Sequence, residues 1–246
     1  MLFFFRKLRK SEMQKKSFVK YFKYAIGEII LVVIGILIAL QINNWNSSRI
    51  QQNKEQSYLK EIQNSLYKDS LALAEVLSFN KEKVQIVNRM MKIFADSLNN
   101  QQRAKIFDKE AIDFVFYRVF EPGRTVFNSL VATETIDLIQ DDQLQKEISA
   151  YYEIDYSAGV QERIIGMNRM VVDEWFPKFF TKEYVQSNLG IKTELPSYST
   201  LKLHQNSKFI SDLYGITRII EIHNLFLGGW LERNHELRTE IQETIN

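Results

Sequence analysis

The sequence has no cysteine and few residues that interrupt helices. Without cysteine, disulfides, thiolate nucleophiles and zinc–thiolate sites are excluded. Only 3 prolines and 9 glycines occur in 246 residues, and none lies between Gly35 and Pro122. A chain with so few turn-forming residues is expected to form long helices. Because 45% of its residues are hydrophobic, it also has enough apolar side chains to bury a core.

Motifs for catalysis are also scarce. The sequence contains no glycine-rich phosphate loop and no nucleophile elbow. Glu232 and His235 have the Glu-x-x-His spacing of di-iron bundles, but the second such pair that a di-iron site needs is missing. We therefore expect a non-enzymatic protein with no catalytic residue, metal or cofactor. A helical-bundle enzyme that uses His223 or His235 is the alternative.

Positive charge is concentrated at the N-terminus. Residues 1–23 contain eight Lys/Arg and one acidic residue, whereas residues 47–246 contain 24 Lys/Arg and 28 Asp/Glu, a net charge of −4. A mildly acidic domain argues against nucleic acid as a partner. We interpret residues 1–20 as a basic amphipathic cytoplasmic tail, with three phenylalanines at the lipid headgroup surface. A disordered tail that only sets the topology is the alternative.

The longest apolar stretch predicts a transmembrane helix. Tyr24–Ile42 would form about 28 Å of helix, enough to cross a bilayer. No small-x-small cleavage site follows it, so we predict a retained signal anchor over residues 21–45 rather than a removed signal peptide. Basic residues stay in the cytoplasm, which places the N-terminus there and residues 46–246 in the periplasm, outside the inner membrane.

Four residues of this segment are candidates for a specific role. Glu28 is an intramembrane acid near the cytoplasmic end, so it is either a proton-carrying group or a carboxylate that reaches headgroups and neighbouring lysines. Gly35 and Ala39 form a small-xxx-small pair that would let two spans approach closely. A homodimer or another membrane protein is therefore a candidate partner besides the lipid bilayer. Trp45 is expected to anchor the helix at the membrane interface.

The span and its flanks resemble a known family. The segments YAIGEI (24–29) and VVIGILIALQINNWN (32–46) are similar to the opening of a family of uncharacterised membrane proteins from Bacteroidota, domain of unknown function 6090. The remainder of the chain is only loosely similar, chiefly in its helices and the Tyr151-Tyr152 pair. The resemblance implies a single-pass protein of a Gram-negative inner membrane. It implies no activity and no catalytic residue.

After the span, residues 46–246 are expected to form an all-α, bundle-like domain. Apolar residues at intervals of three, four or seven predict one long helix that continues from the span to about Asn99. The stripe comprises Leu59, Ile62, Leu66, Leu73, Leu77, Val84, Val87, Met91, Phe94 and Leu98. It fits either a coiled-coil dimer or the core face of an intramolecular bundle. We favour the bundle because three further helices follow.

Capping residues predict where the next helices begin. Asp108 is expected to cap a helix over residues 109–120, which ends at Glu121-Pro122-Gly123. Asp141 or Asp142 is expected to cap a second long helix that continues to about Phe176 and is ended or kinked by Pro177.

The last helix is expected to begin near Asn206 and to reach the C-terminus. His223 falls on its apolar stripe. We expect His223 to be a buried polar residue that is hydrogen-bonded to a neighbouring helix. A ligand-contacting or pH-sensing role for His223 is the alternative. The sequence thus indicates a membrane-tethered module for binding, sensing or scaffolding. Two other functions are an accessory subunit of an ion-driven membrane complex that uses Glu28, and the bundle enzyme named above.

Overall fold

The computed structural model describes the backbone of residues 2–245 and the side chains of residues 22, 23 and 25–245. Every regular element over residues 2–245 is a helix, so the predicted all-α fold is confirmed. The chain divides into two units, Met1–Gln56 and Ser57–Asn246. The predicted amphipathic face of residues 1–20 lies outside the described side chains.

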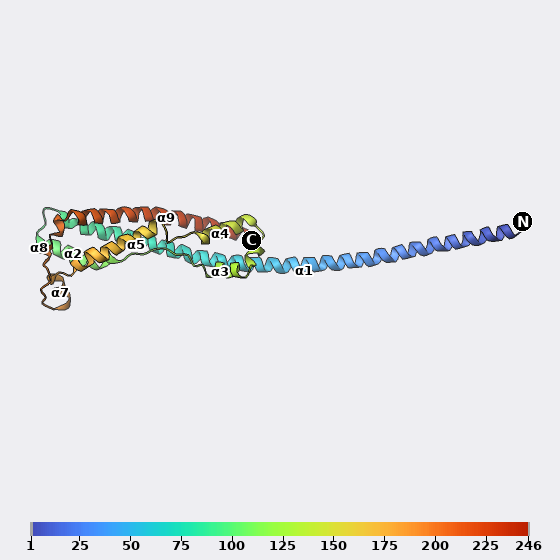
Figure 1. Ribbon diagram of the computed structural model, residues 1–246, viewed down its shortest axis with the longest axis horizontal. Helices are drawn as coiled ribbons and strands as arrows, with labels where there is room; N and C mark the ends of the chain where they lie inside the picture. The colour runs from blue at the N-terminus through green and yellow to red at the C-terminus, as the bar shows by residue number, and fades with distance from the viewer. Residues whose placement is uncertain (1, 246) are drawn as a thin grey trace. The chain divides into compact units, whose positions relative to one another are not determined.

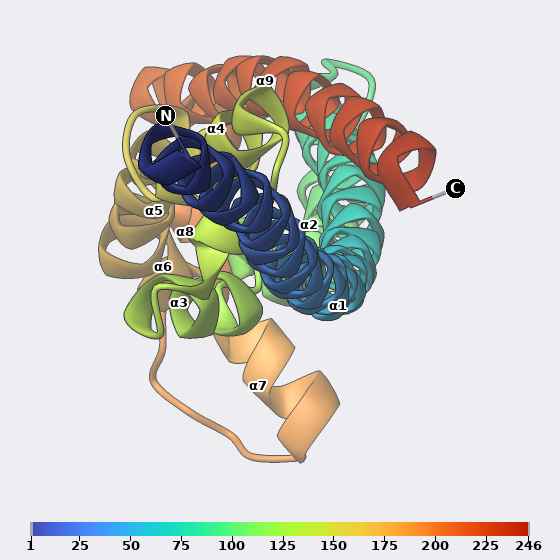
Figure 2. The same ribbon diagram turned by 90° about the vertical axis from the view of Figure 1, so that its right-hand side faces the viewer.

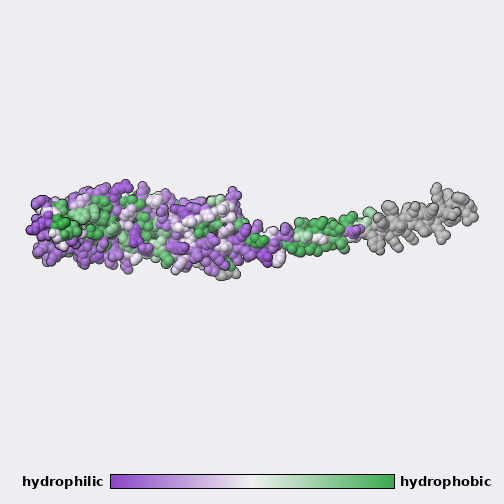
Figure 3. Space-filling model, turned by 90° about the horizontal axis from the view of Figure 1, so that it is seen from below, coloured by the Kyte–Doolittle hydropathy of each residue, from purple (hydrophilic) through white to green (hydrophobic). Residues whose placement is uncertain are grey.

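The first unit consists of the N-terminal part of helix α1 (Leu2–Met91). Among the described residues, α1 is the one helix long and apolar enough to cross a membrane. Its most apolar window of 18 residues has a mean hydropathy of 2.6, and none of that window is buried. Figure 3 shows the resulting hydrophobic band. The helix continues without a break into the second unit, as the sequence predicts.

The second unit is a bundle in which α9 (Ser207–Ile245) lies antiparallel to the last part of α1 (Figures 1 and 2). Gln63 pairs with Gln242, and Asn80 pairs with Asn224. The elements between them are α2 (Asn100–Val115), α3 (Thr125–Ala132), α4 (Asp142–Glu153), α5 (Val160–Met170), a π-helix (η3, Val171–Trp175), α6 (Phe176–Phe179), α7 (Lys182–Leu189) and α8 (Tyr198–Leu201), with 3-10 turns at Lys92–Phe94 (η1), Thr135–Leu138 (η2) and Leu203–Gln205 (η4).

The apolar stripe of α1 forms the core face of this bundle. Leu59, Ile62, Leu66, Leu73 and Val87 are all 0% exposed. Burying a side chain of this size contributes about 1.5–3 kcal/mol. The helices that cover the stripe belong to the same chain, so the prediction of an intramolecular bundle is confirmed.

The predicted boundaries after α1 are wrong. The helix ends at Met91 and closes with η1, eight residues before the expected stop at Asn99. Asn99 instead caps α2, because its Oδ1 accepts from Gln102 N at 2.9 Å while Gln102 Oε1 accepts from Asn99 N at 2.9 Å. Asp108 therefore lies inside α2 and caps no helix. The chain is extended after Val115, where the sequence pattern predicted a helix to residue 120.

The long helix expected from Asp142 to Phe176 is also interrupted. Asp141 caps α4 as predicted, with its Oδ1 accepting from Gln143 N and Leu144 N. However, α4 ends at Glu153, and α5 begins only after Gly159, whose φ of +66° favours glycine. Pro177 lies two residues after the end of the π-helix, in a helical path that continues to Phe179, so it does not end the helix.

The last helix is confirmed, since α9 begins at Ser207 and reaches Ile245. The Oδ1 of Asn206 accepts from Phe209 N at 3.1 Å at its start. The loop-like region predicted over residues 187–205 contains the end of α7, a connection, α8 and η4. Helix α7 stands away from the bundle (Figure 2).

Candidate functional site

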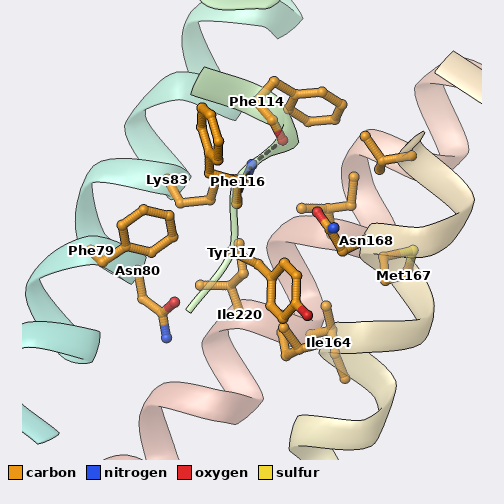
Figure 4. Close-up of a pocket in the computed structure, with 13 residues that line it drawn as sticks. Phe79, Asn80, Lys83, Phe114, Phe116, Tyr117, Ile164, Met167, Asn168 and Ile220 are labelled. Carbon is orange, nitrogen blue, oxygen red and sulfur yellow. Dashed lines mark hydrogen bonds between the residues drawn. The ribbon is translucent and has the colours of Figure 1, made fainter. Parts of the chain in front are cut away.

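A pocket opens inside the second unit where α1, α5 and α9 meet the end of α2. The space inside it that a water-sized probe can occupy is about 30 Å³, well below the roughly 300–1,000 Å³ of typical small-molecule sites. Figure 4 shows side chains converging on it from the three helices and from the extended segment after α2. Most of the lining is apolar, and the polar exceptions are Asn80, Lys83, Asn168 and the hydroxyl of Tyr117.

Lys83 is the unusual residue of this pocket. It is only 6% exposed, and its Nζ donates to the carbonyl oxygens of Asp113 at 3.3 Å, of Phe114, and of Phe116 at 2.8 Å. These carbonyls belong to the end of α2, where the helix leaves acceptors unpaired and its dipole favours a cation. Lys83 thus caps the C-terminal end of α2.

The charge of Lys83 is weakly compensated. Burial lowers its pKa to about 7, while the charge of Asp113 acts in the opposite direction. Among the described side chains, no carboxylate forms a salt bridge with Lys83. The Nζ also lies 4.8 Å from the centroid of the Phe114 ring. Carbonyl dipoles and a ring face therefore take the place of an anionic partner.

The π-helix borders the same pocket through Val171. A π turn places one extra residue in the helix, and such turns often occur at functional sites. Here it directs Trp175 into the core, where its Nε1 donates to Asp212 Oδ2 at 2.9 Å. The helical segment from Val160 to Phe179 therefore both lines the pocket, through Val171, and supplies Trp175 to the core.

A buried polar network around His223 adjoins the pocket through Asn80. Gln161 Oε1 accepts from the backbone N–H of Phe120 at 2.6 Å, which orients the carboxamide. The His223 Nε2 at 3.1 Å from the same oxygen must then be the N–H donor. Its Nδ1 accepts from Asn80 Nδ2 at 3.0 Å. Both ring nitrogens are used by protein groups.

This network assigns His223 a structural state. The ring is 0% exposed, and burial lowers its pKa to about 4. It is therefore neutral at pH 7, with the proton on Nε2. Gln161 completes the network by donating from Nε2 to the carbonyls of Phe120, at 2.8 Å, and of Tyr156.

A second buried polar layer lies further along the bundle. Asp69 accepts from Gly123 N at 2.8 Å and from the Tyr151 hydroxyl at 3.3 Å. Asn234 donates to the carbonyl of Leu66 at 2.9 Å. Burial raises the pKa of Asp69. Asp69 thus joins Gly123, in the segment after α2, to α1, and Asn234 joins α9 to α1.

The other candidates from the sequence lie outside this pocket. Glu28, Gly35, Ala39 and Trp45 all lie in the first unit, on the exposed part of α1. Beyond its chain neighbours and the nearby backbone of its own helix, no atom comes within 4 Å of the Cβ position of Gly35. Trp45 is 65% exposed, with the Arg49 guanidinium 5.6 Å from its ring centroid.

The Glu232 and His235 pair does not form a metal site in the described structure. Both side chains are exposed, and the described residues contain no group of three or more potential metal ligands.

Sequence reasoning missed Lys83, Asn80 and Asn168. A signal for the first two was present, because positions 73, 76, 80, 83, 87 and 90 follow the buried face of α1. Polar residues at two of these six positions mark a place where the core is not purely apolar. Asn168 carries no comparable signal, because it lies beside the π turn that the helical period does not predict.

The comparisons with known proteins give a family but no activity. A family model described as a family of unknown function (DUF6090) matches residues 28–181, more than half of the chain. The matched range includes the pocket residues of α1, α2 and α5 and ends before α9. No curated protein and no solved structure matches the chain significantly.

Proposed function

The chain belongs to this family of unknown function, DUF6090, and we propose that it is a single-pass inner-membrane protein whose helical unit is a non-enzymatic binding module in the periplasm. The observation that carries the proposal is the pocket beside Lys83. Its lining combines apolar walls with a few polar groups, as ligand sites do, while its open volume of about 30 Å³ is small. The buried polar groups that adjoin it through Asn80 already have protein partners, which favours binding over catalysis.

The membrane part of the proposal rests on α1. Its apolar segment exposes large side chains over its whole circumference, for example 73% of Leu31 and 58% of Leu37. A helix that is apolar all round is expected to be surrounded by lipid. The eight basic residues within positions 1–23 favour a cytoplasmic N-terminus.

Reporter fusions after Asn246 test the orientation. Alkaline phosphatase folds and is active only in the periplasm, and green fluorescent protein exported in unfolded form stays dark there. We expect an active phosphatase fusion and a dark fluorescent fusion. A bright fluorescent fusion with inactive phosphatase would reverse the topology.

Thermal denaturation of the full-length protein with a panel of small apolar compounds tests binding. A ligand at 100 times its Kd should stabilise the fold by about 2.7 kcal/mol. Ile220→Trp or Met167→Trp should abolish this gain by filling the pocket, whereas Ile210→Trp on the exposed face of α9 should retain it. Equal gains in the filled and control variants would contradict binding in the pocket.

A further inference from the structure

We propose that the outer face of α9 is an interface for a second copy of this chain. In both ribbon views α9 lies along one edge of the bundle (Figures 1 and 2). The side of α9 turned away from the core carries an exposed apolar surface, which we call the outer patch. It consists of Ile222, Leu225, Phe226 and Gly229. The inference is independent of the pocket beside Lys83, so each proposal can fail without the other.

The outer patch has the spacing of a helix–helix contact. Its four residues recur at i, i+3, i+4 and i+7, away from the buried stripe of α9. Leu225 is 77% exposed, Phe226 50% and Ile222 39%. Single apolar side chains are normal on a surface, whereas a contiguous set marks contact with another molecule. Beyond its chain neighbours and the nearby backbone of α9, no atom lies within 4 Å of the Cβ position of Gly229. A second helix can therefore approach closely there.

A groove beside the outer patch supplies a matching hollow. It lies between the start of α5 and α9, and its lining residues are Gly159, Val160, Arg163, Ile219, Ile222 and Phe226. The space in it that a water-sized probe can occupy is about 220 Å³. This is less than the roughly 300–1,000 Å³ of typical small-molecule sites, so the groove suits a protruding apolar side chain better than a free ligand.

The outer patch and the groove are complementary to each other, which identifies a second copy as the occupant. In a two-fold pair the same surface meets itself, so one side of the contact faces the opposite side on the other copy. Successive residues of a helix are about 100° apart, which places Leu225 on one side of Ile222 and Gly229. Phe226 and the groove lie on the other side. Leu225 of each copy would therefore enter the groove of the other copy.

The position of Arg163 along the bundle follows from the contacts of α5. Gln161 Oε1 lies 3.1 Å from His223 Nε2, whereas Met167 Cε, six residues later in α5, lies 3.3 Å from the Cβ position of Gly215. Helix α5 is therefore antiparallel to α9. Arg163 lies between these two contacts, close to the first, and so is level with the residues of α9 that directly precede His223.

Glu221 supplies the opposite charge at this level, on the Leu225 side of the outer patch. When the two α9 helices are parallel, this side faces the groove of the other copy, which Arg163 lines. Within the part of the chain that the structure describes, Arg163 forms no ion pair, and the carboxylate of Glu221 pairs with Arg218 of its own helix. A contact between Arg163 and Glu221 of two copies would occur twice and would fix the register of the pair.

The membrane helix makes a small interface sufficient. The outer patch spans about two turns of α9, so the contact is small beside the interfaces that hold soluble proteins together. Copies anchored in one membrane have the same orientation, as a two-fold axis along the membrane normal requires. Their confinement also raises the effective concentration of one copy for the other.

Single-cysteine crosslinking of the full-length protein in its membrane tests the proposal. The chain has no cysteine, so one introduced thiol reports on one position. Ile222→Cys and Gly229→Cys, at the centre of the contact, should give a disulfide-linked dimer on mild oxidation. Leu71→Cys and Val131→Cys, at positions 54% and 48% exposed on α1 and α3, should stay monomeric. Equal dimer yields at contact and control positions, or no dimer at either contact position, would overturn the interface.

Two further substitutions separate this interface from association through the span. In the Gly229→Cys protein, Leu225→Lys should abolish the crosslink. Leu225 is 77% exposed, so the helical circular dichroism should be retained. Gly35→Leu, which removes the small-xxx-small pair of the span, should leave the crosslink unchanged. The proposal is wrong if Gly35→Leu abolishes the crosslink and Leu225→Lys keeps it.

Charge reversal tests the register of the pair. In the Gly229→Cys protein, Arg163→Glu and Glu221→Arg should each lower the dimer yield, because like charges would then face each other. The variant with both substitutions should recover the yield, since the opposite charges are restored in exchanged places. Equal yields in the two single variants and the double variant would overturn the pairing of Arg163 with Glu221.

Discussion

Lys83 Nζ donates a 2.8 Å hydrogen bond to the carbonyl oxygen of Phe116, which lies 33 residues later in the chain. This contact joins the folded part of α1 to the segment that forms one wall of the pocket. Lys83 therefore ties α1 to the end of α2 and to the segment that follows it.

Replacing Lys83 by methionine should destabilise the second unit. The carbonyls at the end of α2 lose their donor, which costs about 1–3 kcal/mol in the free energy of unfolding. Removing the buried charge offsets part of this loss. Urea denaturation of the full-length protein, followed by circular dichroism, measures the change. Lys81→Met should alter stability by less than about 0.5 kcal/mol, and equal effects of the two substitutions would contradict the capping role.

His223 should make the fold sensitive to acid. Its pKa is about 4 in the folded state and 6.5 without burial, so the unfolded state binds more protons between these values. The stabilising contribution is fully present above pH 6.5 and is lost as the pH falls towards 4. The loss amounts to at most about 3 kcal/mol. His223→Gln should remove this component of the pH dependence, whereas His235→Gln, at an exposed site, should retain it. Identical pH profiles for the two variants would exclude His223 as the source.

Gln161 should be among the most sensitive polar positions of the bundle. Its carboxamide bonds the N–H and carbonyl of Phe120, the carbonyl of Tyr156 and the ring of His223. Gln161→Leu keeps the volume but leaves four buried groups without this partner, so the free energy of unfolding should fall by about 3 kcal/mol or more. Gln143→Leu, at an exposed position of α4, serves as the control in denaturant titrations. A loss below about 1 kcal/mol for Gln161→Leu would indicate that water replaces the carboxamide.

A charge in the apolar part of α1 should prevent stable membrane insertion. Ile34 is 50% exposed in the structure, and arginine near the centre of a span costs about 2.5–3.5 kcal/mol. Ile34→Arg should therefore move the protein from the carbonate-resistant membrane fraction to the extractable fraction. Ile34→Leu should remain in the membrane fraction. If as much Ile34→Arg as unmodified protein stayed in the carbonate-resistant membrane fraction, the proposal that this segment is a single, barely long enough membrane span would be contradicted.

The long helices could be predicted from the sequence because their apolar period is regular. The stripe from Leu59 to Val87 and the stripe of α9 both repeat over many turns, and each is buried as expected. Burial of a helix face depends only on which residues recur at helical spacing, and this information is local.

The region between α1 and α3 could not be predicted correctly in the same way. Asp108 has the residue type of an N-cap, but Asn99 and Gln102 form a capping box that starts the helix nine residues earlier. The end of α2 is capped by Lys83, which is distant in sequence. The pocket was missed for the same reason, since its lining comes from four separate segments.

The antiparallel contact between α9 and α1 also determines when the protein can fold during synthesis. Leu59, Ile62 and Leu66 pack against Leu237 and Ile241, and Gln63 bonds the carbonyl of Arg238 across 175 residues. The ribosome therefore releases the stripe of α1 long before the helix that covers it. Until α9 is complete, this stripe is covered only in part, by α3 and α4, and remains prone to aggregation.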